Sequence, residues 1–200
     1  VLEAGETGFG GSGRNAGQCS PTFLHANPDE VEKMLGPVFG PRFLRLQGDA
    51  ANLVFGLIDK YGIECEAAQN GLISPAHTPG ALGEVERRYE QYKALGKAVE
   101  LWDRDQVAER IGSDKYHGAW YHPEGGHLNP LGYARGLARA AISEGARVFP
   151  ATPVTAIRPE GTGWRAMTAG GSVLADKVVI GTNAYGGDFW PRIDTPFYRL

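Results

Sequence analysis

Little in this sequence points to an extracellular, membrane-spanning or nucleic-acid-binding protein. Its 200 residues include only two cysteines, Cys19 and Cys65, which cannot form a disulfide framework and show no CxxC spacing. No apolar run approaches the roughly 20 residues that a membrane-spanning helix needs, and no basic segment leads into an apolar one as in a signal peptide. The net charge is -3, without a run of Lys or Arg. We therefore expect a cytoplasmic location, no membrane span and no nucleic-acid partner.

Glycine, by contrast, is abundant. The chain holds 29 glycines, which cluster in the first stretch and again near 125, 161–171 and 181–187. Their spacing fits neither collagen nor low complexity, so they indicate tight turns and close backbone approaches. The 42% hydrophobic and 22% charged composition is that of an ordinary globular chain, with enough residues for one domain or two small ones.

Hydrophobic periodicity and helix-capping residues predict an alternation of strands and helices. A glycine-rich loop after the first strand is expected to enter a helix. Strands are expected at 1–4 (the end of a buried strand), 63–67, 71–74, 99–102, 118–123, 146–149, 154–158, 164–168, 172–174 and 177–180 (a buried strand). Helices are expected from Pro28 to Leu35, Pro41 to Tyr61, Pro79 to about Lys97, Asp103 to Gly112 and Pro130 to Gly145. The last helix is expected to bury Leu131, Leu137, Ala138, Ala141 and Ile142.

The segment "LEAGETGFGGSGRNAGQ", from Leu2 to Gln18, carries the clearest chemistry. In a dinucleotide-binding βαβ unit, an acidic residue at the tip of the second strand accepts hydrogen bonds from the adenosine ribose, and Glu3 ends the first expected strand. A Ser-Gly pair that opens a helix leaves backbone N–H groups for an anion. Ser12 adds a hydroxyl donor and Arg14 a guanidinium. A solvated acid followed by a glycine-rich surface loop is the alternative interpretation.

Four motifs follow one another along the chain: "LEAGETGFGGSGRNAGQ", "GGHLNPLGYARGLARAA", "TPVTAI" and "ADKVVIGTNAY". In this order and spacing they resemble the D-amino-acid oxidase/glycine oxidase (DAO) superfamily of FAD-dependent enzymes, and within it the branch of gamma-glutamylputrescine oxidoreductases. The resemblance covers nearly all of the 200 residues. It implies an α/β fold, in which a Rossmann-like FAD-binding domain is interrupted by a substrate domain built on a β-sheet.

The resemblance also implies a division of the chain and a set of cofactor-binding residues. Residues 1–62 and 128–200 would belong to the FAD-binding domain, and the α+β insert at 63–127 would be a portion of the substrate domain. Glu3 would hold the adenosine ribose, and Val154 would contact the adenine region through its backbone. The other residues expected along the FAD are Ser12, Gly13, Arg14, Asn15, Gly17, Gln18, Gly181, Thr182 and Asn183.

The chain departs from the family pattern at both ends. The first strand and the GxGxxG turn of the family are absent, and with them the main cradle for the pyrophosphate. The sequence ends at "DTPFYRL", where relatives begin the larger part of their substrate-binding sheet. We therefore expect an internal fragment of a longer protein, with an incomplete Rossmann-like domain.

The activity implied for the parent protein is FAD-dependent oxidation of the C–N bond of a small-molecule amine or amino acid to an imine, which water then hydrolyses. This reaction depends on the position of the substrate and on an uncharged amine, and the spacing identifies no catalytic residue. One alternative is a truncated, non-catalytic domain that no longer binds FAD tightly. Such a domain would associate with itself through exposed strand edges and form homo-oligomers. An NAD-dependent dehydrogenase is disfavoured, because the Ser-Gly-Arg-Asn loop has no role there.

Three histidines and a glutamate gather in "HGAWYHPEGGH": His117, His122, Glu124 and His127. Metal ligands must converge on one point, and a spacing of five residues across a strand and a glycine turn does not require them to do so. A structural role is the favoured interpretation, and no metal site is expected. His127 could instead lie at the domain junction, on the substrate side of the flavin.

Overall fold

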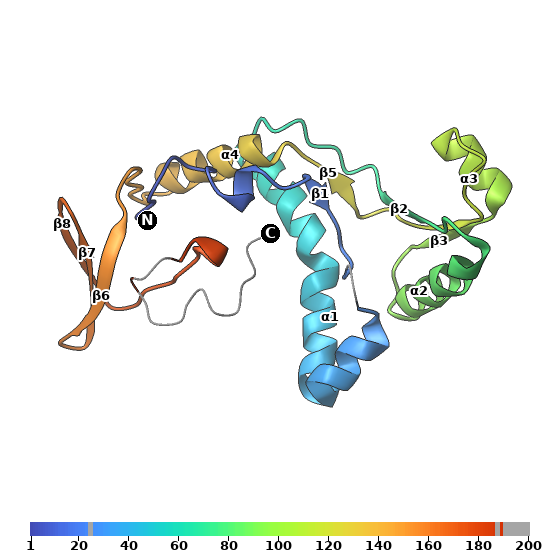
Figure 1. The fold of residues 1–200 in the computed structure, drawn as a ribbon, viewed down its shortest axis with the longest axis horizontal. Helices are drawn as coiled ribbons and strands as arrows, with labels where there is room; N and C mark the ends of the chain where they lie inside the picture. Colours follow the sequence, from blue (N-terminus) through green and yellow to red (C-terminus); the bar gives the residue numbers. More distant parts are fainter. Residues whose placement is uncertain (24–25, 187–188, 190–200) are drawn as a thin grey trace. The chain divides into compact units, whose positions relative to one another are not determined.

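A computed structural model describes residues 1–23, 26–186 and 189 of the chain. The chain divides into two compact units (Figure 1). Unit 1 comprises Val1–Asn15 and Pro130–Leu200, and unit 2 comprises Ala16–Asn129. No helix in the described part of the chain is long and apolar enough to cross a membrane.

Unit 1 begins with a short stretch of parallel backbone pairing. Leu2 forms a parallel bridge with Phe149. The N–H of Glu3 donates to the Phe149 carbonyl at 3.0 Å, and the N–H of Thr152 donates to the Glu3 carbonyl at 2.8 Å. The expected strand at 1–4 therefore forms only this bridge, and Val1 remains 72% exposed because no described strand covers its other side.

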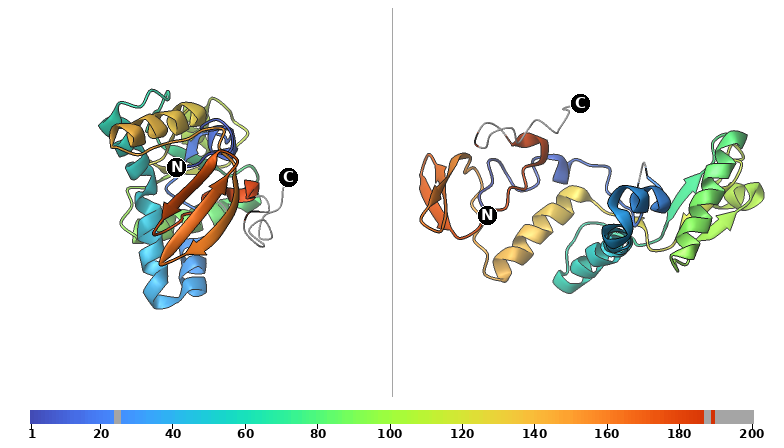
Figure 2. Two further views of the ribbon diagram at one scale, coloured as in Figure 1. Left: turned by 90° about the vertical axis from the view of Figure 1, so that its left-hand side faces the viewer. Right: turned by 90° about the horizontal axis from the view of Figure 1, so that it is seen from below.

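The rest of unit 1 consists of a helix and a three-stranded antiparallel sheet. Helix α4 (Pro130–Ser143) is followed by Gly145, whose φ of 92° allows the chain to leave the helix. Strands β6 (Val154–Glu160), β7 (Gly163–Thr168) and β8 (Gly171–Ala175) pair in the order β6-β7-β8, the twisted meander drawn in orange in Figure 2. The three expected strands of this region are confirmed.

Unit 2 is built around a second antiparallel sheet. Strands β2 (Leu72–Pro75), β4 (Ala119–His122) and β3 (Glu100–Trp102) pair in the order β2-β4-β3. Side chains alternate across β4, so Trp120 and His122 face α2 (Leu82–Ala94), while Ala119 packs with Trp102 and with Val107 of α3 (Arg104–Ile111). As expected, the Asp103 carboxylate caps α3, accepting from the Gln106 N–H at 2.9 Å.

Helix α1 (Pro28–Tyr61) is interrupted at Gly36, whose backbone is non-helical with φ 74°. Two helical segments result, in agreement with the two predicted helices, although the second begins a turn earlier than Pro41. A Cβ at Gly40 would lie 2.8 Å from the Glu32 Cα, so the two segments lie side by side because glycine occupies this position. Gly62 then ends the helix in a left-handed conformation, with φ 57°.

The remaining short elements complete the units. They are the 3-10 turns η1 (Gly11–Gly13), η2 (Pro79–Ala81) and η3 (Asn183–Tyr185), and the paired strands β1 (Gln18–Cys19) and β5 (Gly126–His127). Helix α1 groups with unit 2. Its expected assignment, with the rest of 1–62, to an FAD-binding domain concerns function and stays a prediction.

Several local predictions are wrong. Residues 63–67 form no strand, because β2 takes its partner from β4 rather than from the preceding segment. The run 177–180 is not a strand either: Val179 is 94% exposed, and no strand among the described residues pairs with it. The glycine-rich loop enters only the single turn η1. In α4 the buried residues are Gly136 and Ala140, whereas Ile142 is 54% exposed.

Candidate functional site

Glu3 lies at the point where the parallel pairing of unit 1 ends. Its backbone is held by the 149–152 segment, and its side-chain Oε1 accepts from the Gly5 N–H at 2.9 Å. The side chain is half-buried. Because the hydrogen bond from Gly5 engages only Oε1, Oε2 can accept a hydroxyl from a ligand. The same pairing brings Glu3 close to the start of β6, where Val154 follows Thr152 by two residues. Two of the predicted contact residues are thus neighbours in unit 1.

The glycine loop that follows packs tightly against the first turns of α4. A Cβ at Gly13 would overlap the carbonyl oxygen of Gly8, and a Cβ at Gly8 would lie 2.8 Å from Cδ1 of Leu131. Gly8 also has φ 82°, in the left-handed region. These two glycines are therefore required by close backbone approach within the loop and to the helix, as the glycine content indicated.

The turn η1 uses most of its own donors internally. The N–H groups of Gly13, Arg14 and Asn15 donate to the carbonyls of Gly10 and Gly11. The side-chain amide of Asn15 donates to the carbonyls of Gly11 and Ser12, both at 3.1 Å, which rigidifies the turn. The backbone N–H groups of residues 13–15 are therefore not the anion donors that a helix opening at Ser-Gly would provide.

Two exposed side chains of this turn remain available to a ligand. Ser12 presents its hydroxyl at the surface. The Arg14 guanidinium lies 4.5 Å from the centroid of the Phe9 ring, and within the described residues it forms no ion pair. Stacking on an aromatic ring holds a guanidinium in place while its N–H groups stay free for a phosphate. The arrangement therefore suits a positioned anion-binding arginine.

The predicted residues near the end of unit 1 lie beside the same loop. A Cβ at Gly10 would lie 3.1 Å from the Tyr185 ring, and the Tyr185 N–H donates to the Thr182 carbonyl at 2.9 Å. The Thr182 hydroxyl is buried and finds no hydrogen-bond partner in the described chain. A buried hydroxyl without a partner is costly, so a polar group that reached this atom would stabilise it. Asn183 has a positive φ of 48°, and Gly181 is exposed.

Gly17 and Gln18 belong to unit 2. Gly17 is buried with φ 73°, and its carbonyl accepts from the Leu128 N–H at 2.9 Å. Gln18 is exposed and pairs with His127 between β1 and β5. The structure thus brings together Glu3 with the start of β6, and the η1 loop with 182–185, each within unit 1. The predicted roles of Gly17 and Gln18 stay predictions.

The histidine cluster is separated by the structure of unit 2. His122 is completely buried in β4, whereas His127 is exposed in β5. No three His, Cys, Asp or Glu side chains converge on a possible metal position within the described residues. Burial lowers the pKa of His122 and raises the pKa of the thiols of Cys19 and Cys65, so each of these groups favours its neutral form.

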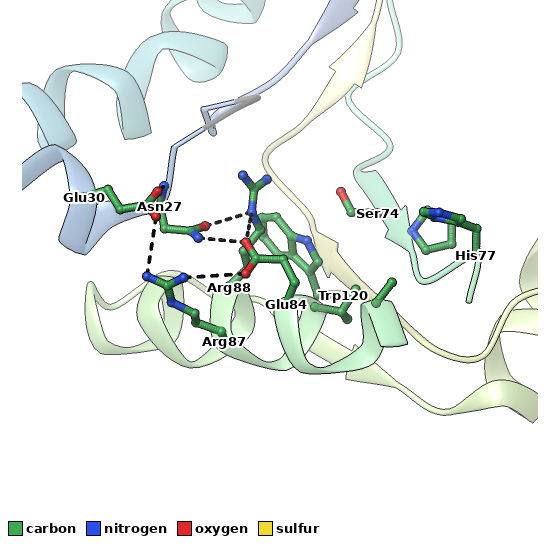
Figure 3. A pocket seen from close by; sticks show the side chains of 11 residues that line it. Asn27, Glu30, Ser74, His77, Glu84, Arg87, Arg88 and Trp120 are labelled. Atoms are coloured by element: carbon green, nitrogen blue, oxygen red, sulfur yellow. Dashed lines mark hydrogen bonds and ion pairs between the residues drawn. The ribbon is translucent and has the colours of Figure 1, made fainter. Parts of the chain in front are cut away.

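A pocket of about 660 Å³, which no sequence motif indicated, lies in unit 2 (Figure 3). It is bounded by the start of α1, by α2 and by strands β2 and β4. Its lining residues are Asn27, Glu30, Ser74, Pro75, His77, Ala81, Glu84, Val85, Arg87, Arg88 and Trp120.

The charged groups on one wall of this pocket bind one another. Figure 3 shows Arg87 and Arg88 reaching from α2 toward the start of α1. Arg88 Nε donates to Asn27 Oδ1 at 2.9 Å, and the Asn27 amide donates to Glu84 at 2.7 Å. Arg87 binds Asp29 at 2.7 Å, which lowers the pKa of that carboxyl. This wall therefore joins α1 to α2. Local sequence patterns could not reveal it, because the partners are about 60 residues apart.

Comparison with known proteins shows which family the chain belongs to. The family model described as "FAD dependent oxidoreductase" (DAO) matches residues 1–200. The chain is 34% identical over 189 residues to gamma-glutamylputrescine oxidoreductase of Escherichia coli K12, covering 94% of this chain and 44% of that protein. It is 30% identical over 187 residues to a probable oxidoreductase, OrdL, of Haemophilus influenzae, covering 92% of this chain and 43% of that protein.

The fold is also that of solved enzymes of this kind. The crystal structure of glycine oxidase from Geobacillus kaustophilus superposes with a TM-score of 0.74 at 26% identity, covering 94% of this chain and 50% of that chain. The chain thus spans less than half the length of the curated relatives named above. The expected resemblance and the α/β, Rossmann-like fold class are confirmed, and FAD is the cofactor of the family. The chain belongs to the DAO family of FAD-dependent oxidoreductases.

Proposed function

We propose that this chain is part of an enzyme that oxidises the C–N bond of an amine or amino acid to an imine, which water hydrolyses, and that unit 1 holds the FAD. Relatives whose names state their chemistry act on gamma-glutamylputrescine and on glycine, an amine and an amino acid. When bound, FAD supplies the acceptor for the hydride that leaves the substrate carbon. The chain's own part is to bind and orient that cofactor.

The placement of Glu3 carries the proposal. Its backbone is fixed by the 149–152 segment, its Oε1 by Gly5, and its Oε2 is left to accept a ribose hydroxyl. Arg14 and Ser12 supply donors for phosphate oxygens, and Val154 offers its backbone to the adenine. The Thr182 hydroxyl, which has no hydrogen-bond partner among the described residues, would gain one from FAD. Asn15 keeps η1 in shape, while Gly13 is needed for the close approach to Gly8.

The experiment is an FAD titration of the purified chain, in which binding is measured by the quenching of flavin fluorescence. Glu3→Ala should weaken FAD binding by about 1–3 kcal/mol, because a hydrogen bond to a charged acceptor is lost. Glu6→Ala is the matched control: it removes the same charge three residues away, at an exposed position, and should leave the affinity unchanged. Equal affinities for wild type and Glu3→Ala would remove Glu3 from the site.

The same titration separates the two other candidate functions. Colourless protein that takes up no added FAD would support a truncated domain without cofactor binding. Binding of NADH without binding of FAD would support a nicotinamide enzyme. For protein that binds FAD, the substrate class is tested by adding amines and amino acids without oxygen, where bleaching of the flavin absorption identifies a substrate.

A further inference from the structure

Helix α1 carries apolar side chains on two faces, of which one is buried and the other is partly exposed. The core face consists of Leu44, Ala51, Phe55 and Ile58. A second row, here called the α1 stripe, consists of Phe39, Phe43, Leu46, Ala50, Leu53 and Leu57. Of these, Phe39, Leu46 and Leu53 are 63%, 68% and 64% exposed. Phe43 is 42% exposed and stacks on Phe23 of the same chain, while Ala50 and Leu57 are half-buried. Large contiguous exposed apolar patches on a protein surface usually mark an interaction site.

The spacing of the α1 stripe is that of a helix-pairing seam. Its members follow one another at intervals of four, three, four, three and four residues. This is the alternation of a coiled-coil heptad, in which two helices pack along a narrow apolar row. From Phe39 to Leu57 the row extends over about 27 Å of helix. The stripe is therefore suited to an apolar helix rather than to a small ligand.

The charges beside the stripe indicate which helix fits. Arg42 and Asp49 are exposed, lie seven residues apart and flank the same side of the row. If two copies of α1 pair antiparallel with the two-fold axis between Phe43 and Leu46, Arg42 of each copy lies beside Asp49 of the other. A parallel pair would set these charges beside Gln47 and Val54, without an opposite charge. The flank is thus complementary to itself, as a two-fold interface requires.

The antiparallel alignment also matches side-chain size. It sets Phe43 of one copy against Leu46 of the other, and Phe39 against Ala50, a large side chain facing a small one. Asp49 remains available, because its side chain is 76% exposed and its ion pair with Lys97 within the chain is long, at 3.6 Å. Lys97 itself has a closer partner in Glu124, at 2.9 Å.

We propose that the α1 stripe is the interface of a symmetric, antiparallel dimer of this chain, held by the apolar row and by two Arg42–Asp49 pairs between the copies. This inference is independent of FAD binding. It also differs from association through sheet edges, because it names a helix face.

The test is a charge reversal followed by sedimentation equilibrium of the purified chain. Arg42→Asp and Asp49→Arg should each weaken the dimer at least about tenfold, because each sets like charges side by side. The double variant, Arg42→Asp with Asp49→Arg, should restore the wild-type dissociation constant. Restoration is not expected if the single variants merely damage the fold, and circular dichroism of each variant checks its helix content.

The apolar row is tested separately. Leu46→Glu should give a monomer, whereas Leu174→Glu, at a similarly exposed leucine of β8 (58%), should leave the dimer intact. A wild-type chain that is monomeric at every concentration would overturn the proposal, as would a dimer that neither charge reversal weakens. A double variant as weak as the single ones would exclude the Arg42–Asp49 pairing and with it this alignment.

Discussion

The two units differ in how they are held together. Nearly all buried hydrophobic side chains in the described part of the chain belong to unit 2, including Trp120, Val107 and Ile58, whereas unit 1 contributes only Ala140. Unit 1 relies on backbone hydrogen bonds, on the β6–β8 meander and on glycines that let the loop approach α4. The predicted contacts with FAD lie mostly in this unit.

This difference separates the main source of stability, in unit 2, from the proposed cofactor contacts, most of which lie in unit 1. Burial of apolar area is the main source of folding free energy, so unit 2 has its own source of stability. The described part of unit 1 buries few apolar side chains, so a ligand that binds its folded state should stabilise it by mass action. The following variants test this contrast.

The largest effect is expected from Trp120→Ala. The Trp120 side chain is 1% exposed and stacks on Tyr92 with ring centroids 5.2 Å apart. Truncation should cost about 3–5 kcal/mol in the free energy of unfolding of unit 2. Trp164→Ala in β7 of unit 1 is the control, because its side chain is only half-buried. Urea denaturation with hydrogen exchange measured for each segment would assign the losses, and equal losses would contradict the contrast.

A smaller effect is expected within unit 1 from Gly13→Ala. The added methyl group would overlap the Gly8 carbonyl oxygen, so the loop must move away, at a cost of about 1–3 kcal/mol. Gly11→Ala, in the same turn, meets nothing within 4 Å and should be tolerated. Hydrogen exchange should rise in 5–15 and in the first turn of α4 for Gly13→Ala alone. If Gly11→Ala behaved likewise, the close packing would not be the cause.

The smallest effect is a pH dependence confined to unit 2. Burial lowers the pKa of His122 from 6.5, while Glu124 opposes and Lys97 reinforces the shift. Below pH 6.5 the unfolded chain therefore binds a proton that the folded chain resists, and stability decreases as pH falls. Above pH 6.5 the imidazole is neutral in both the folded and the unfolded chain, so this loss of stability is absent. His122→Phe should flatten the pH dependence of unfolding between 7 and about 5.5, whereas His77→Gln, at an exposed position, should not. An unchanged slope in His122→Phe would exclude His122 as its source.

Local sequence signals predicted the helix ends that depend on a capping side chain or on a left-handed glycine. Asp103 and Gly112 delimit α3 as expected, and Gly62 ends α1, because capping side chains and left-handed glycines act within a few residues. The meander was also predictable, since alternating residues between glycine turns favour short antiparallel strands.

Predictions failed where a distant partner decides the structure. The residues at 177–180 are apolar enough for a strand, but a strand also needs a neighbour to accept its hydrogen bonds. The pocket wall of Asn27, Glu84 and Arg88 joins segments far apart in sequence, so no short motif announces it. For the cofactor site, the motifs identified the family, while the roles of single residues await the FAD titration.

By itself, the sequence determined the limits of α3, the left-handed glycine that ends α1 and the family to which the chain belongs, because these depend on short-range sterics, caps and motif order. Only the tertiary structure decided that Glu3 is fixed by the 149–152 segment, that the Thr182 hydroxyl is buried without a hydrogen-bond partner among the described residues, and that α1 has a second, partly exposed apolar row. These features arise from pairing and burial between segments that are remote in sequence, and such contacts leave no local pattern to read.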